Sequence, residues 1–162
     1  PAQTTAPGNF TLAQTLTEHS GGVGAVTVSP DGKTLVSGSS DRTIKIWNLE
    51  TGRLLRTLTG HTNPVLSVVI SPDGKTLVSG SSDRTIKIWN LETGRLRRTL
   101  SGHSGGIYSV AISPDSKTLV SGSGDGTIRI WNLATGRLQR LVNPRSGMIL
   151  SVAISPDGKT LA

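Results

Sequence analysis

The chain has 162 residues, 34% of them hydrophobic, with 20 glycines, no cysteine and a formal net charge of +7 at pH 7. This length is enough for one ordinary domain, and the lack of cysteine excludes both disulfide bonds and thiolate metal sites. The sequence contains no apolar run long enough to cross a bilayer and no secretory signal, so we expect a cytoplasmic protein that does not bind membranes.

At the N-terminal end, residues 1–9 are small, polar and proline-containing, which predicts a linker or a disordered terminus. Residues 10–17 resemble residues 54–59 and 96–101, so we expect them to form the last strand (strand d) of a repeat whose first part is absent. Because residue 1 is proline rather than methionine, we interpret the chain as a piece of a longer protein.

The rest of the sequence repeats with a period of 42 residues. Residues 29–54 recur letter for letter at 71–96 and, with a few changes, at 113–138, while a fourth copy starts at 155 and stops at 162. Repetition of this kind predicts units that can bury their apolar faces only against one another.

Within the first repeat, residues 23–28, 34–39, 43–49 and 53–58 each have the composition of a short strand, and helical periodicity is absent. The first two are separated by Ser-Pro-Asp-Gly, in which proline fixes φ and glycine accepts a positive φ, as a tight turn requires. Four short antiparallel strands in a repeat of this length, with a tryptophan near the end of the third, predict one blade of a β-propeller.

The repeated motifs resemble those of WD-repeat β-propellers. They are Gly60-His61 and Gly102-His103 before the first strand, and the pairs Trp47-Asn48, Trp89-Asn90 and Trp131-Asn132 in the third. The resemblance implies an all-β, partial propeller of four-stranded antiparallel blades over residues 10–162. We expect three full blades at 18–59, 60–101 and 102–143, and parts of a fourth at 144–162. Such regular copies are also similar to those of bacterial proteins, including kinases in which a linker and a propeller follow the catalytic domain.

Each full repeat contains a histidine, a serine, an aspartate and a tryptophan at fixed spacing, which raises the possibility of a Ser-His-Asp catalytic triad. Three equivalent active sites in one small chain are improbable, and no nucleophile elbow is present. The resemblance implies instead that the four side chains form a structural hydrogen-bonded chain, here called the tetrad. The tetrads are His19, Ser37, Asp41 and Trp47; His61, Ser79, Asp83 and Trp89; and His103, Ser121, Asp125 and Trp131.

No other motif predicts an enzyme, a metal site or a cofactor site. Gly-Lys-Thr at 32–34, 74–76 and 158–160 resembles the end of a phosphate-binding loop, but the first glycine of that loop and the following helix are absent. The glycosylation pattern at Asn9 has no secretory signal to give it meaning. The three histidines lie 42 residues apart, on separate blades, which excludes a shared metal site.

The resemblance places partner-binding residues on the top of a blade, at the start of the first strand and just before the hairpin aspartate. The first-strand positions are Gly24, Leu66, Tyr108 and Leu150, and the hairpin positions are Ser40, Ser82 and Gly124, with Arg42 and Arg84 beside them. Tyr108 is the only tyrosine, and an aromatic or apolar side chain beside arginine is typical of a binding hot spot. The alternative is neutral drift at a tolerant position.

The positive charge is spread over the repeats. The cations follow the first turn (Lys33, Lys75, Lys117), lie in the third strand (Lys45, Lys87, Arg129) or open the fourth strand (Arg53, Arg95, Arg137). This distribution predicts a solvated basic surface; the alternative is a polyanion-binding surface formed by the fourth-strand arginines. Nucleic acid is therefore an improbable partner.

The fourth copy departs from the others because Arg145 stands where the histidine is expected and the third strand is missing. Propellers close with about four to eight blades, so three and a half leave open faces and unpaired edges. We therefore predict a fragment of a longer propeller, with self-assembly through the open faces as the alternative. The leading function is a non-catalytic protein-interaction scaffold; a polyanion-binding surface and an accessory domain of a larger enzyme such as a kinase remain alternatives.

Overall fold

The computed structural model describes residues 14–145 and 147–162, and its strands form three antiparallel sheets of four strands each. Strands that follow one another in the chain are neighbours in each sheet. The fold class predicted from the sequence, an all-β partial propeller, is confirmed. The predicted linker at 1–9, the glycosylation pattern at Asn9 and the first part of the predicted strand at 10–17 lie outside the described residues.

We call the sheets blades 1, 2 and 3. Blade 1 contains β1 (Val23–Val28), β2 (Thr34–Ser39), β3 (Ile44–Asn48) and β4 (Leu54–Leu58). Blade 2 contains β5 (Val65–Ile70), β6 (Thr76–Ser81), β7 (Ile86–Asn90) and β8 (Leu96–Leu100). Blade 3 contains β9 (Ile107–Ile112), β10 (Thr118–Ser123), β11 (Ile128–Asn132) and β12 (Leu138–Val142).

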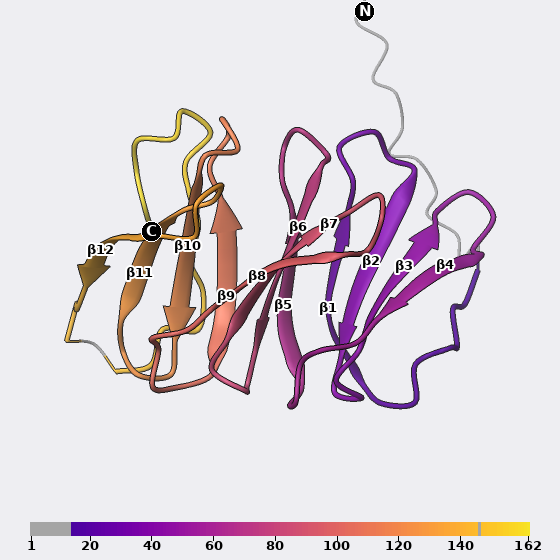
Figure 1. Cartoon of the computed structure of the whole chain (residues 1–162), viewed down its shortest axis with the longest axis horizontal. Coiled ribbons are helices and arrows are strands. Elements are labelled where there is room, and N and C mark those ends of the chain that lie inside the picture. The colour runs from indigo at the N-terminus through magenta and orange to yellow at the C-terminus, as the bar shows by residue number, and fades with distance from the viewer. Residues whose placement is uncertain (1–13, 146) are drawn as a thin grey trace, which may run out of the picture.

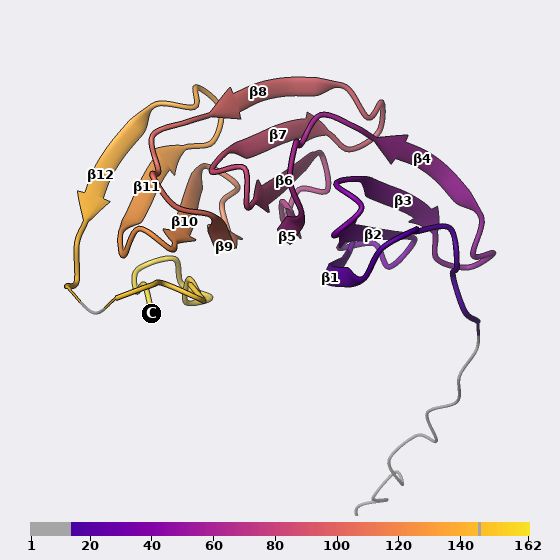
Figure 2. The same cartoon turned by 90° about the horizontal axis from the view of Figure 1, so that it is seen from below.

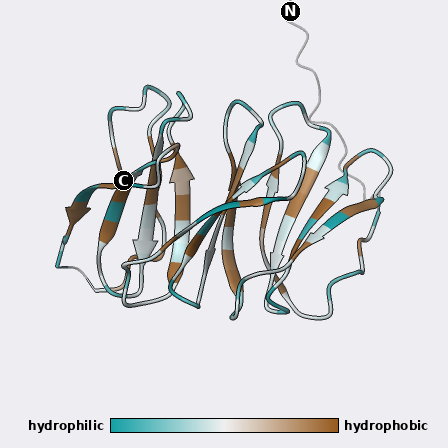
Figure 3. Cartoon of the chain, viewed as in Figure 1, coloured by the Kyte–Doolittle hydropathy of each residue, from teal (hydrophilic) through white to brown (hydrophobic). Residues whose placement is uncertain are grey.

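The blades stand side by side along an arc (Figures 1 and 2). The first strands β1, β5 and β9 lie on the inner side of the arc, and the last strands β4, β8 and β12 lie on the outer side. Hydrophobic residues gather along the strands, whereas the turns are mostly hydrophilic (Figure 3). Two blades therefore bury apolar side chains in the layer between them, as the repeat pattern requires.

The core between blades 1 and 2 consists of one face from each sheet. Val36, Ile44 and Ile46 of blade 1 meet Val65 and Leu77 of blade 2. The equivalent residues of blades 2 and 3 form a second core, in which Ile107 takes the place of Val65. Each blade therefore presents two different faces, one to the preceding blade and one to the following blade.

A glycine in the second strand of each blade allows the next blade to approach the backbone. A Cβ built on Gly80 would lie 2.6 Å from Cγ2 of Ile107, and one on Gly38 would lie 2.7 Å from Cγ1 of Val65. Because real Cβ atoms do not approach other atoms so closely, any larger residue here would push the blades apart.

One face of blade 1 has no described blade against it. Val23, Val26 and Val28 are 51%, 63% and 48% exposed, while Val65 and Val68, the blade 2 equivalents of the first two, are 1% and 8% exposed. The same side chains that are core residues in blade 2 thus form an apolar surface on blade 1.

The fourth copy follows blade 3 as the beginning of a further blade. A bridge joins Ile154 to Leu161, and Val152 is buried against blade 3, where Ile149 packs on Gly122. Arg145 has a φ of 56°, and no histidine is available there for a network like that of the other blades.

The strand predicted at 10–17 is not formed in its described part, because residues 14–17 have no regular structure. A last strand must pair with a third strand, and none is described beside this segment. Gln14 nevertheless lies 3.4 Å from the carbonyl oxygen of Thr51, much as Arg56 lies 3.2 Å from that of Glu92 at the next junction. Residues 14–17 therefore lie beside the turn of blade 1 without forming a strand.

Candidate functional site

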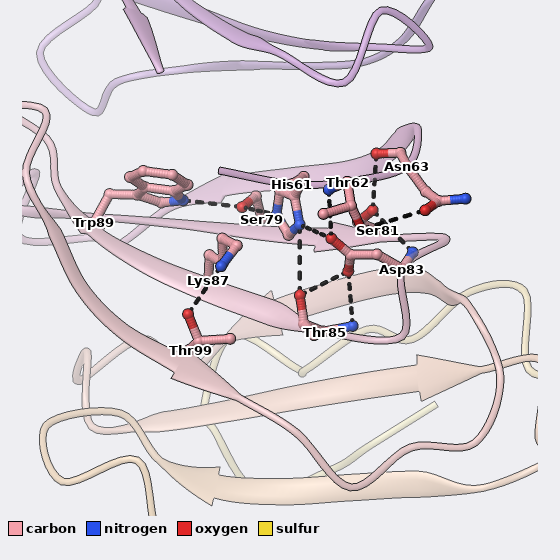
Figure 4. A network of polar contacts seen from close by, with 10 residues as sticks. All are labelled: His61, Thr62, Asn63, Ser79, Ser81, Asp83, Thr85, Lys87, Trp89 and Thr99. Atoms are coloured by element: carbon pink, nitrogen blue, oxygen red, sulfur yellow. Dashed lines mark hydrogen bonds and ion pairs between the residues drawn. The ribbon is translucent and has the colours of Figure 1, made fainter. Parts of the chain in front are cut away.

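A chain of hydrogen bonds connects the tetrad of blade 2 (Figure 4). Trp89 Nε1 donates to Ser79 Oγ at 2.9 Å, and Ser79 Oγ lies 2.8 Å from Nε2 of His61. Nδ1 of His61 lies 2.7 Å from Oδ2 of Asp83. Thr85 extends the chain because its hydroxyl donates to Oδ1 of Asp83 at 2.6 Å. The four predicted residues are therefore in contact. The bonds run from the tryptophan of the third strand through the serine and the histidine to the aspartate of the hairpin.

The other two full blades repeat this geometry. The His–Asp, His–Ser and Trp–Ser distances are 2.8, 2.7 and 2.9 Å for His19, Asp41, Ser37 and Trp47. They are 2.9, 2.9 and 3.0 Å for His103, Asp125, Ser121 and Trp131. The network is therefore part of the repeated unit.

The donors and acceptors fix the direction of the chain. An indole N–H can only donate, so Ser79 Oγ accepts from Trp89 and is free to donate its own proton to Nε2 of His61. A neutral imidazole then carries its proton on Nδ1 and donates to Asp83. Every polar atom of the chain has a partner in this arrangement, as buried polar groups require.

The pKa shifts agree with a neutral histidine beside a charged aspartate. Burial lowers the pKa of His61 and outweighs the opposing effect of Asp83; the same holds for His103 beside Asp125. Burial alone would raise the pKa of Asp83, but hydrogen bonds from Thr85 and His61 outweigh it and hold that pKa below its ordinary value.

The network ties the loop before the first strand of a blade to the hairpin between its second and third strands. The backbone N–H of Thr62 donates to Asp83 Oδ2 at 3.1 Å, and Ser81 Oγ donates to the carbonyl oxygen of Asn63 at 3.0 Å. A further backbone bond joins Ser82 N to the Pro64 carbonyl at 3.0 Å. We call the end of the blades that carries these loops the top face.

The network is not arranged for nucleophilic catalysis. Ser79 is fully buried, and its oxygen already binds both Trp89 and His61. A substrate has no access to that hydroxyl, and a catalytic serine must be open to the substrate carbonyl. The arrangement holds loops in place.

Two of the three third-strand cations are not solvated as predicted. Lys45 and Lys87 are buried, and each donates from Nζ to a threonine on the neighbouring last strand, at 3.0 Å to Thr57 and 2.9 Å to Thr99. The prediction was wrong because the long apolar stem of lysine packs within the blade, while only the head requires a polar partner.

The predicted partner-binding residues of blades 2 and 3 lie close together on the top face. Leu66 is half-buried and Tyr108 is 39% exposed. A Cβ on Gly106 would lie 3.9 Å from Cδ1 of Leu66, and one on Gly124 would lie 3.0 Å from Cε2 of Tyr108. The tyrosine ring therefore lies over the hairpin of its own blade, and Leu66 lies beside the loop that enters blade 3.

The remaining predicted residues are exposed at equivalent places. Leu150 is 61% exposed and follows Ile149, the residue that packs on blade 3. Arg42 and Arg84 occupy the hairpin turns with φ of 71° and 69°, where blade 3 has Gly126. No described hydrogen bond or ion pair joins either arginine to another side chain of the top face, so the structure places them on its loops without locking them.

The other motifs that the sequence offered hold no bound chemistry in the described part of the chain. Gly-Lys-Thr at 32–34 forms the turn between β1 and β2, in which Gly32 has a φ of 71°. Residues 14–145 and 147–162 hold no cluster of three potential metal ligands. Within the same ranges, no helix is long and apolar enough to span a membrane.

A comparison with known protein families finds one match in each repeat. The family described as WD40 (WD domain, G-beta repeat) matches residues 10–48, 52–90 and 94–132. The chain is 53% identical over 38 residues to a ribosome biogenesis protein BOP1 homolog of Drosophila melanogaster. The matched stretch makes up 24% of this chain and 5% of that protein. It is 55% identical over 38 residues to protein HIR1 of Kluyveromyces lactis, and this match makes up 24% of this chain and 4% of that protein.

Solved structures resemble the chain over most of its length. Those of U3-55K and of the RRP9 WD40 repeats each have a TM-score of 0.82 and 27% sequence identity, and each covers 85% of this chain. The chain spans 44% and 43% of those chains, and a far smaller part of the curated relatives above.

Replacing His61 with alanine should lower the free energy of unfolding by about 1–3 kcal/mol, because Ser79 and Asp83 each lose a buried partner. Urea denaturation followed by tryptophan fluorescence would measure the change. Thr62→Ala is the matched control, since the neighbouring exposed residue keeps its backbone bond to Asp83. Equal stability of His61→Ala and the control would contradict the structural role.

Lowering the pH from about 7.5 to about 5.5 should lower the melting temperature. Burial holds the pKa of His61 and His103 below 6.5 in the folded protein, so over this range the unfolded chain binds more protons than the folded one. Their contribution is complete above about pH 6.5 and is lost as the pH falls through the folded-state pKa values. Thermal melts across the range would measure it, and His103→Asn should give a shallower slope. A melting temperature that rises on acidification would refute the assignment of neutral histidines.

Proposed function

Because the chain belongs to the WD40 repeat family, we propose that it is a non-catalytic scaffold that binds a partner protein through the top face of blades 2 and 3. WD40 repeats typically mediate protein–protein interaction. The observation that carries the proposal is the exposed Tyr108 on β9, with Leu66 on the neighbouring strand β5, next to loops whose positions the tetrads fix.

The physical basis is a preorganised apolar patch. A rigid loop loses little conformational entropy when it binds, so more of the contact energy appears as affinity. Tyrosine and leucine supply apolar area, and the exposed Arg84 on the neighbouring hairpin can add a charged contact. Blade 1 has Gly24 and Ser40 at the corresponding positions and offers no such side chains.

The relatives support the proposal that this chain binds its partner as part of a larger assembly. One of them is a ribosome biogenesis protein, and we propose that this chain likewise holds components of a complex together. The relatives named above come from a fly and a yeast, so they add no support for a bacterial, kinase-linked protein, which stays a hypothesis. A cytoplasmic location stays a proposal based on the sequence alone.

The polyanion-binding alternative has less support. Arg53, Arg95 and Arg137 are exposed, but each belongs to a different blade, and each is separated from the next by a full repeat. Only residues 95–98 hold several arginines close together in the chain, and nucleic-acid affinity depends on many cations that meet neighbouring phosphates. We therefore place the interaction on the top face.

Tyr108→Ala should leave the melting temperature nearly unchanged and weaken the partner by about tenfold or more, as hot-spot residues do. Proteins captured from a cell extract by the immobilised chain would be compared by quantitative mass spectrometry, and the affinity of the recovered partner then measured. Leu141→Ala is the control, because Leu141 is 51% exposed but lies on the outer strand β12. Tyr108→Leu, which copies position 66, should retain part of the affinity. Equal capture by Tyr108→Ala would overturn the site.

A second candidate function is self-assembly, which the exposed face of blade 1 favours. Its residues Val23 and Val26 repeat core positions of blade 2. At the other end of the chain, Ile149 and Val152 of the fourth copy already fill these positions on blade 3, so a second copy would add its blade 1 beside the fourth copy and the half-buried Ile128 and Ile130. The two sides complement each other inside the chain at both junctions. A second copy could therefore dock head to tail.

This candidate predicts that the solution mass of the chain rises with concentration and that Val26→Asp abolishes the rise, because a charge cannot be buried in an apolar interface. Light scattering after size exclusion would measure the mass. Leu141→Asp places the same charge on another exposed apolar residue and should have no effect. A monomeric wild-type chain at every concentration would exclude self-assembly.

A further inference from the structure

A pocket of about 560 Å³ opens between blades 1 and 2, at the end of the sheets opposite the top face. The Ser-Pro-Asp turns of the two blades form two of its walls, and the outer strand β4 and the turn that follows β7 form the rest. Its volume is within the usual range of about 300–1,000 Å³ for ligand sites. It uses no residue of the tetrads or of the top-face patch.

The pocket combines apolar and charged groups. Ile46 and Leu91 are buried beneath it, and Leu55 is 49% exposed at its side. Asp31 and Glu92 also line it, with Asp73 on the facing turn. The lining thus offers an apolar surface within reach of three carboxylates.

A single lining cation opposes the three carboxylates. Arg56 donates from Nε to the carbonyl oxygen of Glu92 at 3.2 Å, which holds its guanidinium at the junction of the blades. The ion pairs in the described ranges involve only the tetrad histidines and aspartates, so none of the three carboxylates is paired with a basic side chain.

The two aspartates stay ionised. The Ser29 hydroxyl and the Lys33 amide bind Oδ1 of Asp31, and these bonds lower its pKa, with a smaller contribution from the charge of Lys33. Asp73 has the equivalent bonds, and its pKa is lowered in the same way, with smaller contributions from Lys75 and Arg97. Those three cations neighbour the turns but do not line the pocket.

The junction between blades 2 and 3 lacks the distinguishing groups. Arg97 stands where the first junction has Leu55, and Ala134 stands where it has Glu92. Ser116 replaces glycine in the facing turn, and the N–H of Asp73 donates to its hydroxyl at 3.2 Å, so a hydrogen bond bridges the two turns. The fold therefore accepts either set of residues at a junction. Of these two junctions, only the first combines an apolar residue with an acidic one.

From this combination we propose that the pocket between blades 1 and 2 binds a peptide segment of a partner protein in which a lysine or arginine lies beside an apolar side chain. The apolar side chain packs on Leu55 and Leu91, while the cation lies among Asp31, Asp73 and Glu92. A peptide fits better than an enclosed metabolite because most of the rim is exposed, and small-molecule sites surround most of their ligand. The proposal is independent of the top-face patch, since the two share no residue.

A random hexapeptide library displayed on phage tests the ligand chemistry. Selection on the whole chain should enrich sequences that join Lys or Arg to a neighbouring apolar residue. Synthetic peptides from the enriched set should shift the amide resonances of Asp31, Asp73 and Leu91 in NMR titrations, and their binding should weaken as salt is added. Enrichment of acidic peptides, or shifts confined to Tyr108 and its surroundings, would overturn the proposal.

The second junction supplies matched variants. Leu55→Arg with Glu92→Ala copies blades 2 and 3 and should keep the fold while weakening the peptide by about tenfold or more, because a like charge now faces its cation. The reciprocal change, Arg97→Leu with Ala134→Glu and Ser116→Gly, should create a second site and raise the peptide stoichiometry from one to two. Unchanged affinity in the first variant would refute the site. Tyr108→Ala should bind the peptide as the wild type does, which separates this result from the outcome of the top-face test.

Discussion

The whole structure depends on how closely one blade approaches the backbone of the blade before it. At Gly38, Gly80 and Gly122 a Cβ would lie 2.7, 2.6 and 2.6 Å from the side chain of the next blade, closer than real Cβ atoms come. Glycine in a strand costs conformational entropy and leaves no side chain to pack. It is present here because the neighbouring blade supplies the missing side chain, Val65 or Ile107, which fills the space above the backbone.

The same short stretch of strand also holds the loops. Side chains alternate between the two faces of a strand, so Ser79 and Ser81 lie on one side of β6 and Gly80 on the other. Ser79 binds Trp89 and His61, and Ser81 binds the carbonyl of Asn63, while Gly80 receives Ile107. Blade spacing and loop position are therefore set by three consecutive residues. This coupling explains why the top-face loops keep the same geometry in each full blade.

Most of the fold could be predicted from the sequence because local chemistry and repetition agree. The expected strand at 43–49 is observed as β3 (Ile44–Asn48), and the expected strand at 34–39 is β2 (Thr34–Ser39). The conformation of the Ser-Pro-Asp-Gly turn is determined by its own four residues, so predicting it needed no tertiary information. The contacts of each tetrad came from a family resemblance, since its members lie up to 28 residues apart in the chain, from His61 to Trp89.

The missed features depend on contacts between distant parts of the chain. The burial of Lys87 requires Thr99 on the next strand, and no pattern within β7 reveals that partner. The pocket between blades 1 and 2 joins Leu55 to Glu92, which belong to different repeats. A comparison of the repeats position by position could have identified Leu55 as a departure, but Glu92 repeats Glu50, and only the structure shows that Leu55 and Glu92 share one cavity.

Departures from the repeat are the positions at which this chain can carry specific function, since the shared residues are already occupied in building the blade. Drift would change such positions independently. Blade 3 instead changes two of them together: Tyr108 replaces the leucine of blade 2, and Gly124 replaces its hairpin serine. A Cβ at Gly124 would lie 3.0 Å from the tyrosine ring, so the loss of the serine side chain gives the ring its space. Two substitutions that fit each other sterically at an exposed position favour a selected surface over neutral drift.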